Sequence, residues 1–261
     1  PSHTAYFHFD GHINIEILFY GANMQTITQR VLSDTVYSKG TAVLTYTIRY
    51  PYFTTTCSEA AALSINAFLF HRRPKEEGTA AQSWLPQASV QAEYAKKDNY
   101  PFFGYEFISA YTVTWNSGCM TSLYTDQYTY TGGAHGSTIR TSDTWDFSSG
   151  SYLTLADFYP HNPAYREGIF RILDQQVKAR EKDSPSTYFD DYPALIRSTF
   201  KPESFFVTPK GIVIYFQQYD IAPYSTGIPE FLIPFKKAGN ARNSRQNGTF
   251  FRRLSSNWFH F

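Results

Sequence analysis

The stretch from Tyr105 to Trp145 limits the fold more than any other part of this sequence, because it is dense in threonine, tyrosine, valine and isoleucine. Two turn signals interrupt it, Asn116-Ser-Gly118 and Gly132-Gly133. Residues of these types favour strands, and short glycine-containing turns between such runs favour hairpins. The pattern predicts antiparallel strands at about 106–115, 119–130 and 135–146.

The rest of the chain alternates between strand-like and helix-like segments. A Ser-Lys-Gly turn interrupts an alternating run after Gln25, which predicts a hairpin. Ser58 is placed to cap a helix that runs to about His71, and Pro86 is expected to kink the first turns of a second helix. Further helices are expected at about 163–180 and 192–200, and further strands at 204–208, 211–217 and 230–235. The predicted class is α+β, with a mainly antiparallel sheet and helices packed on one side.

Length and composition predict one folded unit with two atypical ends. The chain has 261 residues, of which 42% are apolar, so it can fill a core. We expect a single α+β unit over 25–235, formed by an N-terminal module (25–115) and a C-terminal module (116–235). Residues 1–24 precede or include the first methionine and are interpreted as a non-native or disordered head. Residues 236–261 are interpreted as a disordered basic tail.

Charge argues against nucleic acid as the main partner. The tail holds six basic residues and no acid, so with a formal total of +1 the rest of the chain is about five charges negative. A mildly acidic folded unit does not attract phosphates. There is also no apolar run long enough for a membrane span, so any membrane contact is expected through an anchor outside this sequence.

The two cysteines, Cys57 and Cys119, are far apart and have no histidine or cysteine at metal-ligand spacing. We therefore expect neither a metal site nor a cofactor. The cysteines are compatible with one long-range disulfide in an oxidising compartment or with two unpaired buried thiols, and the sequence leaves both interpretations open.

The glycine-rich segment from Tyr130 to Gly136 is the most distinctive in the chain. No Lys-Ser or Lys-Thr follows it, so it is not a phosphate-binding loop. Its glycines Gly132, Gly133 and Gly136 predict positive φ angles and close backbone approach at a hairpin. Its histidine, His135, is interpreted as structural, as a ligand contact or as catalytic. No nucleophile motif accompanies it, so we expect no enzymatic activity.

A second segment, from Tyr215 to Phe231, is a strand that leads into a loop punctuated by proline and glycine and then into another strand. Pro223 stiffens this loop, so Tyr219 and Tyr224 can be held out to a partner at low entropic cost. The alternative is that these tyrosines simply cover the edge of the sheet.

The paired acids Asp190 and Asp191 are like those that open the metal site of polysaccharide deacetylases. Such a site also needs a histidine-rich partner motif, and the only histidine after Asp191 is His260. We therefore interpret the two acids as the start of a helix, where they complement the helix dipole.

Two long motifs resemble a known family, YTGGAHGSTIRTSDTWDFSSGSYLTLADFY and FFVTPKGIVIYFQQYDIAPYSTGIPEFLIPF. They resemble the C-terminal region of RsiV-type anti-sigma factors and of related Firmicute envelope proteins, known as domain of unknown function 3298. The preceding TITQRVLSDTVYSKGTAVLTYTIRYPYF resembles the companion domain 4163, which also precedes the catalytic domain of a peptidoglycan deacetylase. The resemblance covers about 25–235 and implies one α+β unit outside the cell membrane.

The same resemblance implies a sensor or binding function. The RsiV ectodomain binds lysozyme, so the contact candidates here are the seven residues Gly132, Gly133, His135, Gly136, Tyr219, Pro223 and Tyr224. The sigma-binding segment and membrane helix of RsiV and the catalytic half of the deacetylase have no counterpart in this sequence. We expect a non-catalytic extracytoplasmic module whose ligand is a protein such as lysozyme. The alternative is a cell-wall glycan, because aromatic residues make up 18% of the chain.

Overall fold

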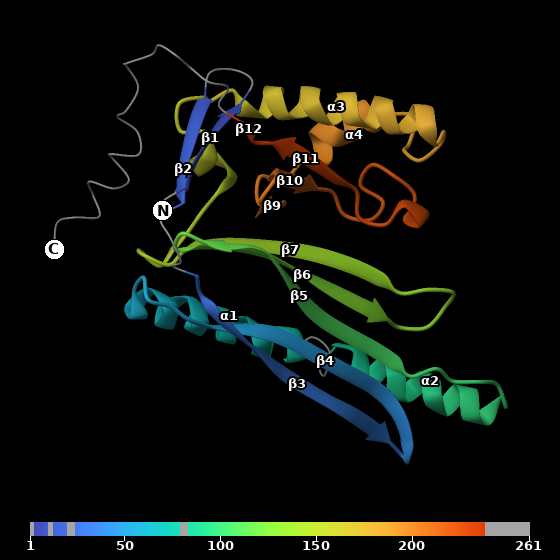
Figure 1. Ribbon diagram of the computed structural model, residues 1–261. Coiled ribbons are helices and arrows are strands. Elements are labelled where there is room, and N and C mark those ends of the chain that lie inside the picture. Colours follow the sequence, from blue (N-terminus) through green and yellow to red (C-terminus); the bar gives the residue numbers. More distant parts are fainter. Residues whose placement is uncertain (1–2, 10–12, 20–23, 79–82, 238–261) are drawn as a thin grey trace, which may run out of the picture.

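The protein is seen here in a computed structural model, which describes residues 3–9, 13–19, 24–78 and 83–237 (Figure 1). A six-stranded sheet forms its centre, with the order β3-β4-β5-β6-β7-β8. The bounds of these strands are β3 Thr26–Ser38, β4 Thr41–Thr54, β5 Tyr105–Ser117, β6 Met120–Tyr130, β7 Ser137–Asp146 and β8 Ser151–Tyr152. The predicted β5-β6-β7 meander and the first hairpin are confirmed, with ends shifted by one or two residues.

One pairing in this sheet is parallel. β4 and β5 run side by side in register from Leu44 opposite Tyr105 to Ile48 opposite Ser109. Parallel neighbours need a crossover connection, and here α1 (Glu59–Gly78) and α2 (Leu85–Lys97) supply it. The remaining pairings of the sheet are antiparallel.

Residues at the N-terminal ends of α1 and α2 explain where these helices begin. The side chain of Ser58 accepts a hydrogen bond from the backbone N–H of Ala61 (3.3 Å), so the predicted cap of α1 is confirmed. Pro86 lies in the first turn of α2, where its missing N–H has no intrahelical partner to lose. α2 itself is therefore not kinked at Pro86, because Pro86 lies at its start; the expected helix start near residue 80 lies outside the described residues.

α1 and α2 cover one face of the six-stranded sheet. The core under α2 contains Leu44, Ile48 and Ala88, and the core under α1 contains Ile65 and Leu123. The Asn66 side chain of α1 also pairs with the backbone of Phe53, accepting from its N–H (2.8 Å) and donating to its carbonyl (2.7 Å).

A β-bulge in β5 sends neighbouring apolar residues to opposite faces. The register shifts between Val113 and Trp115, which lie opposite Leu123 and Ser122 of β6. Val113 therefore packs under α1, whereas Trp115 enters the core of the second sheet.

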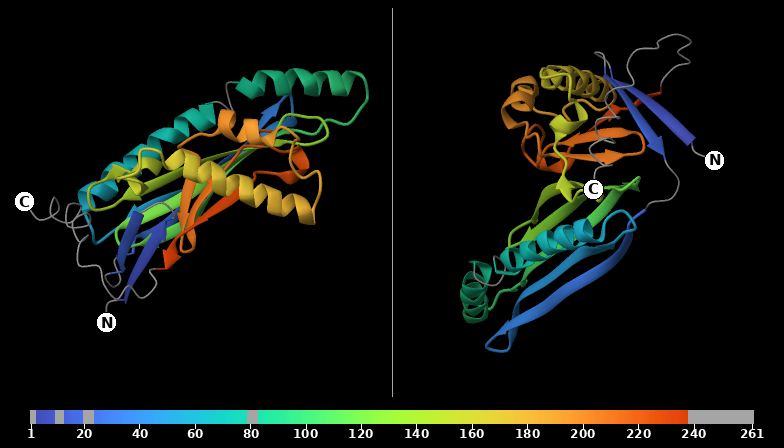
Figure 2. Two further views of the ribbon diagram at one scale, coloured as in Figure 1. Left: turned by 90° about the horizontal axis from the view of Figure 1, so that it is seen from above. Right: turned by 90° about the vertical axis from the view of Figure 1, so that its left-hand side faces the viewer.

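The second sheet has the order β11-β10-β9 and lies on the face opposite α1 and α2 (Figures 1 and 2). Leu123 of β6 packs under α1, and its neighbour Tyr124 packs on Phe206 of β9 with ring centroids 5.0 Å apart. The strands are β9 Phe205–Thr208, β10 Gly211–Tyr215 and β11 Glu230–Pro234.

The outer side of this second sheet carries α3 (Tyr165–Asp183) and α4 (Tyr192–Thr199), after the 3-10 turn η2 (Leu155–Phe158). Each sheet thus has its helices on one side, and the two sheets face each other. The expected α+β class with mainly antiparallel pairing and helices on one side is confirmed. That the strands divide into two facing sheets was not predicted.

The two ends of the chain contribute a separate three-stranded sheet of order β12-β1-β2. Strands β1 (His3–Phe9) and β2 (Ile13–Phe19) lie where we expected a non-native or disordered head, and β12 (Lys236–Lys237) opens the expected tail. The rest of the tail, 238–261, lies outside the described residues. The six-stranded sheet also runs across the expected module boundary at residues 115 and 116.

Cys57 and Cys119 form a disulfide across 62 residues of sequence, which decides between the two interpretations left open above. The bond ties the loop after β4 to the β5-β6 turn. Cys119 itself adopts a left-handed conformation (φ 61°) in that turn.

Candidate functional site

The two segments that the sequence singled out meet at one end of the molecule (Figure 1). One is the β6-β7 loop, and the other is the β10-β11 loop with its 3-10 turn η3 (Tyr224–Thr226), which Pro223 caps. The ring of His135 stacks on that of Tyr224, with centroids 3.8 Å apart and planes 19° apart. The Tyr224 hydroxyl donates to the carbonyl of Gly136 (2.9 Å). Loops separated by nearly ninety residues in sequence therefore form a single surface.

Tyr219 extends this surface. Its ring lies 5.9 Å from that of Tyr224, and 56% of the residue is exposed. Its backbone is left-handed (φ 67°), which is uncommon for a residue with a side chain. We call the group of exposed His135 and Tyr219 with half-buried Tyr224 the aromatic ledge.

The contacts of His135 define its tautomer. Its Nδ1 lies 2.9 Å from the Gly136 carbonyl oxygen, which can only accept a hydrogen bond. Nδ1 therefore carries a proton, and in the neutral ring Nε2 carries the lone pair. The stacked ring and this bond together hold the imidazole in place.

The predicted positive φ angles are confirmed at Gly132 and Gly133 but not at Gly136, where glycine is needed for close approach instead. Gly132 and Gly133 have φ angles of 95° and 92°, which residues with side chains rarely adopt. At Gly136 a Cβ atom would lie 2.5 Å from both the Tyr128 ring and the Thr129 carbonyl. Only glycine fits there without a shift of these neighbours.

Two glutamines, which sequence reasoning missed, fasten the second loop to the edge of β7. The Gln217 side chain accepts from the Arg140 N–H (2.9 Å) and donates to the Arg140 carbonyl (2.7 Å), as a neighbouring strand would. Gln218 accepts from the Thr138 N–H (2.8 Å). The sequence signal for this contact was a pair of adjacent glutamines at the end of a strand. Alternate residues of β7 present their backbone groups on one edge, where such side chains can bond.

Arg140 joins both sheets beneath the ledge. Its buried guanidinium binds both carboxylate oxygens of Asp126 (2.6 and 2.7 Å) and also pairs with Glu230 of β11. It lies 3.8 Å from the centroid of the Tyr124 ring. Burial lowers the pKa of Arg140, but its bonds and charge interactions with the two acids outweigh burial and raise the pKa above its ordinary value.

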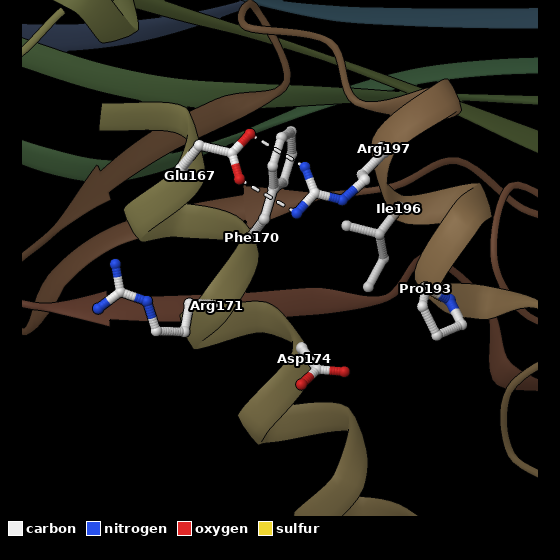
Figure 3. Close-up of a pocket in the computed structure, with 7 residues that line it drawn as sticks. All are labelled: Glu167, Phe170, Arg171, Asp174, Pro193, Ile196 and Arg197. Carbon is white, nitrogen blue, oxygen red and sulfur yellow. Dashed lines mark hydrogen bonds and ion pairs between the residues drawn. The ribbon is translucent and has the colours of Figure 1, made fainter. Parts of the chain in front are cut away.

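A cleft of about 390 Å³ lies between α3 and α4 (Figure 3). The Glu167 carboxylate forms two bonds with the Arg197 guanidinium (3.0 and 3.1 Å), which itself lies over the Phe170 ring. Asp174 accepts from the Lys178 ammonium (2.7 Å) and the Tyr192 hydroxyl (3.2 Å). These polar groups satisfy one another, so the cleft gives a weaker indication of a ligand than the ledge does.

The paired acids stand at a helix start, as expected. Asp191 is the N-cap residue of α4, although its side chain forms no capping bond. Within the described ranges, no group of three histidine, cysteine or acidic side chains is arranged to hold a metal ion.

Two protein families match separate parts of the chain. Residues 37–138 match the family model described as "Deacetylase PdaC", and residues 156–236 match "Protein of unknown function (DUF3298)". The second match agrees with the resemblance noted for the motif at 205–235, whereas the motif at 130–159 lies mostly before it. The first match contains β4, β5 and β6, and the second contains β9, β10 and β11, so the β6-β7 and β10-β11 loops of the ledge fall one in each.

A curated relative matches the first region. It is the peptidoglycan-N-acetylmuramic acid deacetylase PdaC of Bacillus subtilis (strain 168), 28% identical over 102 residues, which are 37% of this chain. The match spans only 21% of that protein's length. This chain is thus similar to one segment of a cell-wall enzyme.

One solved structure shares the fold, and a second is less similar. A DUF3298 family member from Bacteroides fragilis NCTC 9343 superposes with a TM-score of 0.60 at 18% identity, covering 82% of this chain and 92% of that one. A DUF3298 family protein from Pseudomonas aeruginosa PAO1 gives a TM-score of 0.49 at 17% identity, covering 80% and 91%. The first of these supports the α+β architecture. In the described part of this chain, no helix has the length and apolar character needed to cross a membrane.

Proposed function

We propose that this chain is a non-catalytic, extracytoplasmic binding module that holds cell-wall glycan. The observation that carries the proposal is the aromatic ledge, where two distant loops lock together and leave Tyr219 more than half exposed. A large exposed ring on a rigid loop is available for contact without a further ordering cost.

Glycan is the favoured ligand because of ring chemistry and the relative's substrate. A flat tyrosine face suits the apolar face of a pyranose ring, and the exposed hydroxyl can bond to sugar hydroxyls. The similar segment in Bacillus subtilis belongs to an enzyme named for peptidoglycan N-acetylmuramic acid. An accessory module joined to such an enzyme would bind the polymer on which the enzyme acts.

The contacts of His135 support a binding role over a catalytic one. Its Nδ1 donates to a backbone carbonyl and its ring is covered by Tyr224. A catalytic histidine needs a nucleophile or substrate proton at one nitrogen and an orienting acid at the other. Among the described residues, the His135 ring bonds to the Gly136 carbonyl, and neither a nucleophile nor an acid is bonded to it.

The disulfide supports a location outside the cytoplasm. Bonds between cysteines persist in oxidising compartments and are rare in reducing ones. Cys57 and Cys119 are bonded, and the relative in Bacillus subtilis acts on the cell wall.

A protein ligand such as lysozyme is the second candidate, as in an RsiV-type sensor of a Firmicute envelope protein. The rigid loop favours it, since Gln217 and Gln218 tie the β10-β11 loop to β7. Tyrosines presented on preorganised loops are frequent anchors of protein interfaces.

Binding assays with matched tyrosine variants test both candidates. The whole chain is incubated with purified peptidoglycan and sedimented, and lysozyme is titrated into it in a calorimeter. Tyr219→Ala is expected to weaken binding about tenfold. The control is Tyr94→Ala on α2, because Tyr94 (57%) and Tyr219 (56%) are equally exposed.

The outcomes separate the candidates. Binding to peptidoglycan that only Tyr219→Ala weakens supports the glycan proposal. The same pattern with lysozyme alone supports a protein sensor. No binding to either, or equal loss in both variants, overturns the assignment of function to the ledge.

A further inference from the structure

The outer edge of β3 is a long strand edge without a partner among the described residues. β3 has 13 residues and pairs with β4 on one side only. The β3-β4 hairpin projects away from the second sheet, so that sheet leaves the edge open (Figures 1 and 2). Such edges readily pair with another strand unless proline, charge or a bulge prevents it. β3 has no proline, and its register shift lies at Val36/Tyr37, close to the turn.

One hydrogen bond shows which residues face the open edge. The backbone N–H of Thr35 donates to its neighbour's side chain, Asp34 Oδ1, at 2.7 Å. This N–H therefore points away from β4. Because backbone directions alternate along an antiparallel strand, Val31 and Ser33 present their backbone groups to the same open edge.

The sequence of β3 is complementary to itself around Leu32. When two copies pair antiparallel at this point, Arg30 of each copy lies opposite Asp34 of the other. The same register pairs Val31 with Ser33. Arg30 and Asp34 are the two charged residues of the strand, and both are exposed. The pairing thus places each charged side chain of β3 opposite a side chain of the other sign.

The backbone geometry accepts the same register. The outward-facing residues Val31 and Ser33 fall opposite each other, as a hydrogen-bonded pair requires. Arg30 and Asp34 then fall at non-hydrogen-bonded positions, where facing side chains are closest. Twofold symmetry forms this ion pair twice.

The helices leave room for a second copy. α2 lies over β4, so two such helices would be separated by three strand spacings, ~14 Å. Packed helices approach to about 8–10 Å, so no clash arises. Leu32, half-buried beside α2, would face its own copy across the symmetry axis.

We propose that the outer edge of β3 is a self-association surface, on which two copies of this chain pair antiparallel around Leu32 and extend the sheet across both. In the single chain Arg30 lies over the Tyr52 ring (4.0 Å) and Asp34 binds Thr35. On pairing, Asp34 releases the Thr35 N–H to the partner backbone and receives Arg30 of the other copy. The proposal is independent of the ligand of the ledge.

Charge-swap variants in analytical ultracentrifugation give the first test. The wild-type chain is expected to dimerise with rising concentration. Arg30→Glu and Asp34→Lys each place like charges opposite, and each is expected to weaken the dimer at least tenfold. An equimolar mixture of the two variants restores opposite charges and is expected to form a heterodimer. A wild-type chain that stays monomeric throughout, or variants that dimerise as it does, would overturn the proposal.

A cysteine pair gives the second test and fixes the register. Leu32→Cys places two thiols face to face, about 4.5 Å apart between Cα atoms, which suits a disulfide. Under added oxidant, a non-reducing gel should show a covalent dimer. The control is Thr28→Cys, on the same face of β3, whose counterpart lies ~26 Å away along the strands. Equal cross-linking of both variants, or of neither, contradicts the register.

Discussion

The two ends of β6 are anchored by different chemistry. At the β5-β6 turn, Cys119 is bonded to Cys57, and the Cys119 carbonyl accepts a hydrogen bond from the Phe147 N–H. Both cysteines pack against the aromatic core that contains Phe147. At the β6-β7 loop, glycines bend the chain, and His135 and Tyr224 join two loops by stacking and hydrogen bonds. The first end is packed into the protein, whereas the second is exposed.

This difference indicates that the two ends of β6 have different roles. A covalent bond backed by Phe53 and Phe147, whose centroids lie 5.1 Å apart, holds the register of the sheet. Polar contacts at the other end orient side chains without burying them, so their rings remain available to a ligand. Rigid scaffolds that position exposed loops are a common arrangement for binding sites.

Removing the disulfide should have the largest effect on stability. Cys57→Ala/Cys119→Ala opens a link across 62 residues, for which chain entropy predicts a loss of about 4 kcal/mol in the free energy of unfolding. Denaturant titration measures this loss. Ligand binding at the ledge should persist in the folded fraction. If binding is lost while the fold remains, the two ends of β6 are not independent.

Removing Arg140 should have the next largest effect. Arg140→Met leaves Asp126 and Glu230 without their shared partner, and we expect the free energy of unfolding to fall by about 2–3 kcal/mol. The loss stays below that of a fully buried pair because both acids keep some contact with water. Lys178→Met removes an exposed ion pair and should leave thermal unfolding unchanged. Equal effects of the two variants would contradict a bridging role for Arg140.

Gly136→Ala should disturb the exposed end selectively. The added methyl meets the Tyr128 ring and the Thr129 carbonyl at 2.5 Å, so we expect a loss of about 2 kcal/mol together with loss of ledge binding. The matched control is Gly168→Ala in α3, where nothing lies within 4 Å of the added atom. It should raise stability by about 0.5–1 kcal/mol and leave binding intact. Calorimetric unfolding and the binding assay measure both.

The smallest effect concerns pH and lies on the packed face of β7. Burial raises the pKa of Asp143, and the bond with Arg72 only partly opposes this. The folded chain therefore binds this proton more tightly than the unfolded chain does. The contribution of Asp143 to stability should rise as pH falls through the raised pKa and level off below the ordinary aspartate value.

Asp143→Asn isolates this contribution, because it has the same shape and does not titrate. Unfolding free energies of both proteins are compared from neutral to acidic pH. The wild type should gain stability relative to the variant as pH falls. A relative loss would mean that Arg72, and not burial, dominates at Asp143.

Local signals predicted most elements of the fold. The glycine and asparagine turns marked the β5-β6-β7 meander, and Ser58 marked the start of α1. The parallel pairing of β4 with β5 left no such signal, because it depends on where the α1-α2 connection returns the chain. The face of the sheet on which Trp115 lies could not be predicted either, since a bulge of one residue decides it.

Both loops of the candidate site were found from the sequence, but their contact was not. Gly132 and Gly133 have the positive φ angles expected of them, and Pro223 caps a turn in the stiffened loop. The role of Gln217 was missed because its partner, the backbone of Arg140, is distant in sequence. The adjacent glutamines at the end of the strand were a signal for an edge contact, but they do not identify the partner strand.

The amino-acid sequence alone therefore determined what depends on neighbours along the chain: turns, caps, strand alternation and the stiffness of two loops. Tertiary structure alone decided the stacking of His135 on Tyr224, the bond between Cys57 and Cys119, and the facing of the two sheets. The physical reason is range. Backbone preferences act over a few residues, whereas these contacts form only after packing has brought distant strands together.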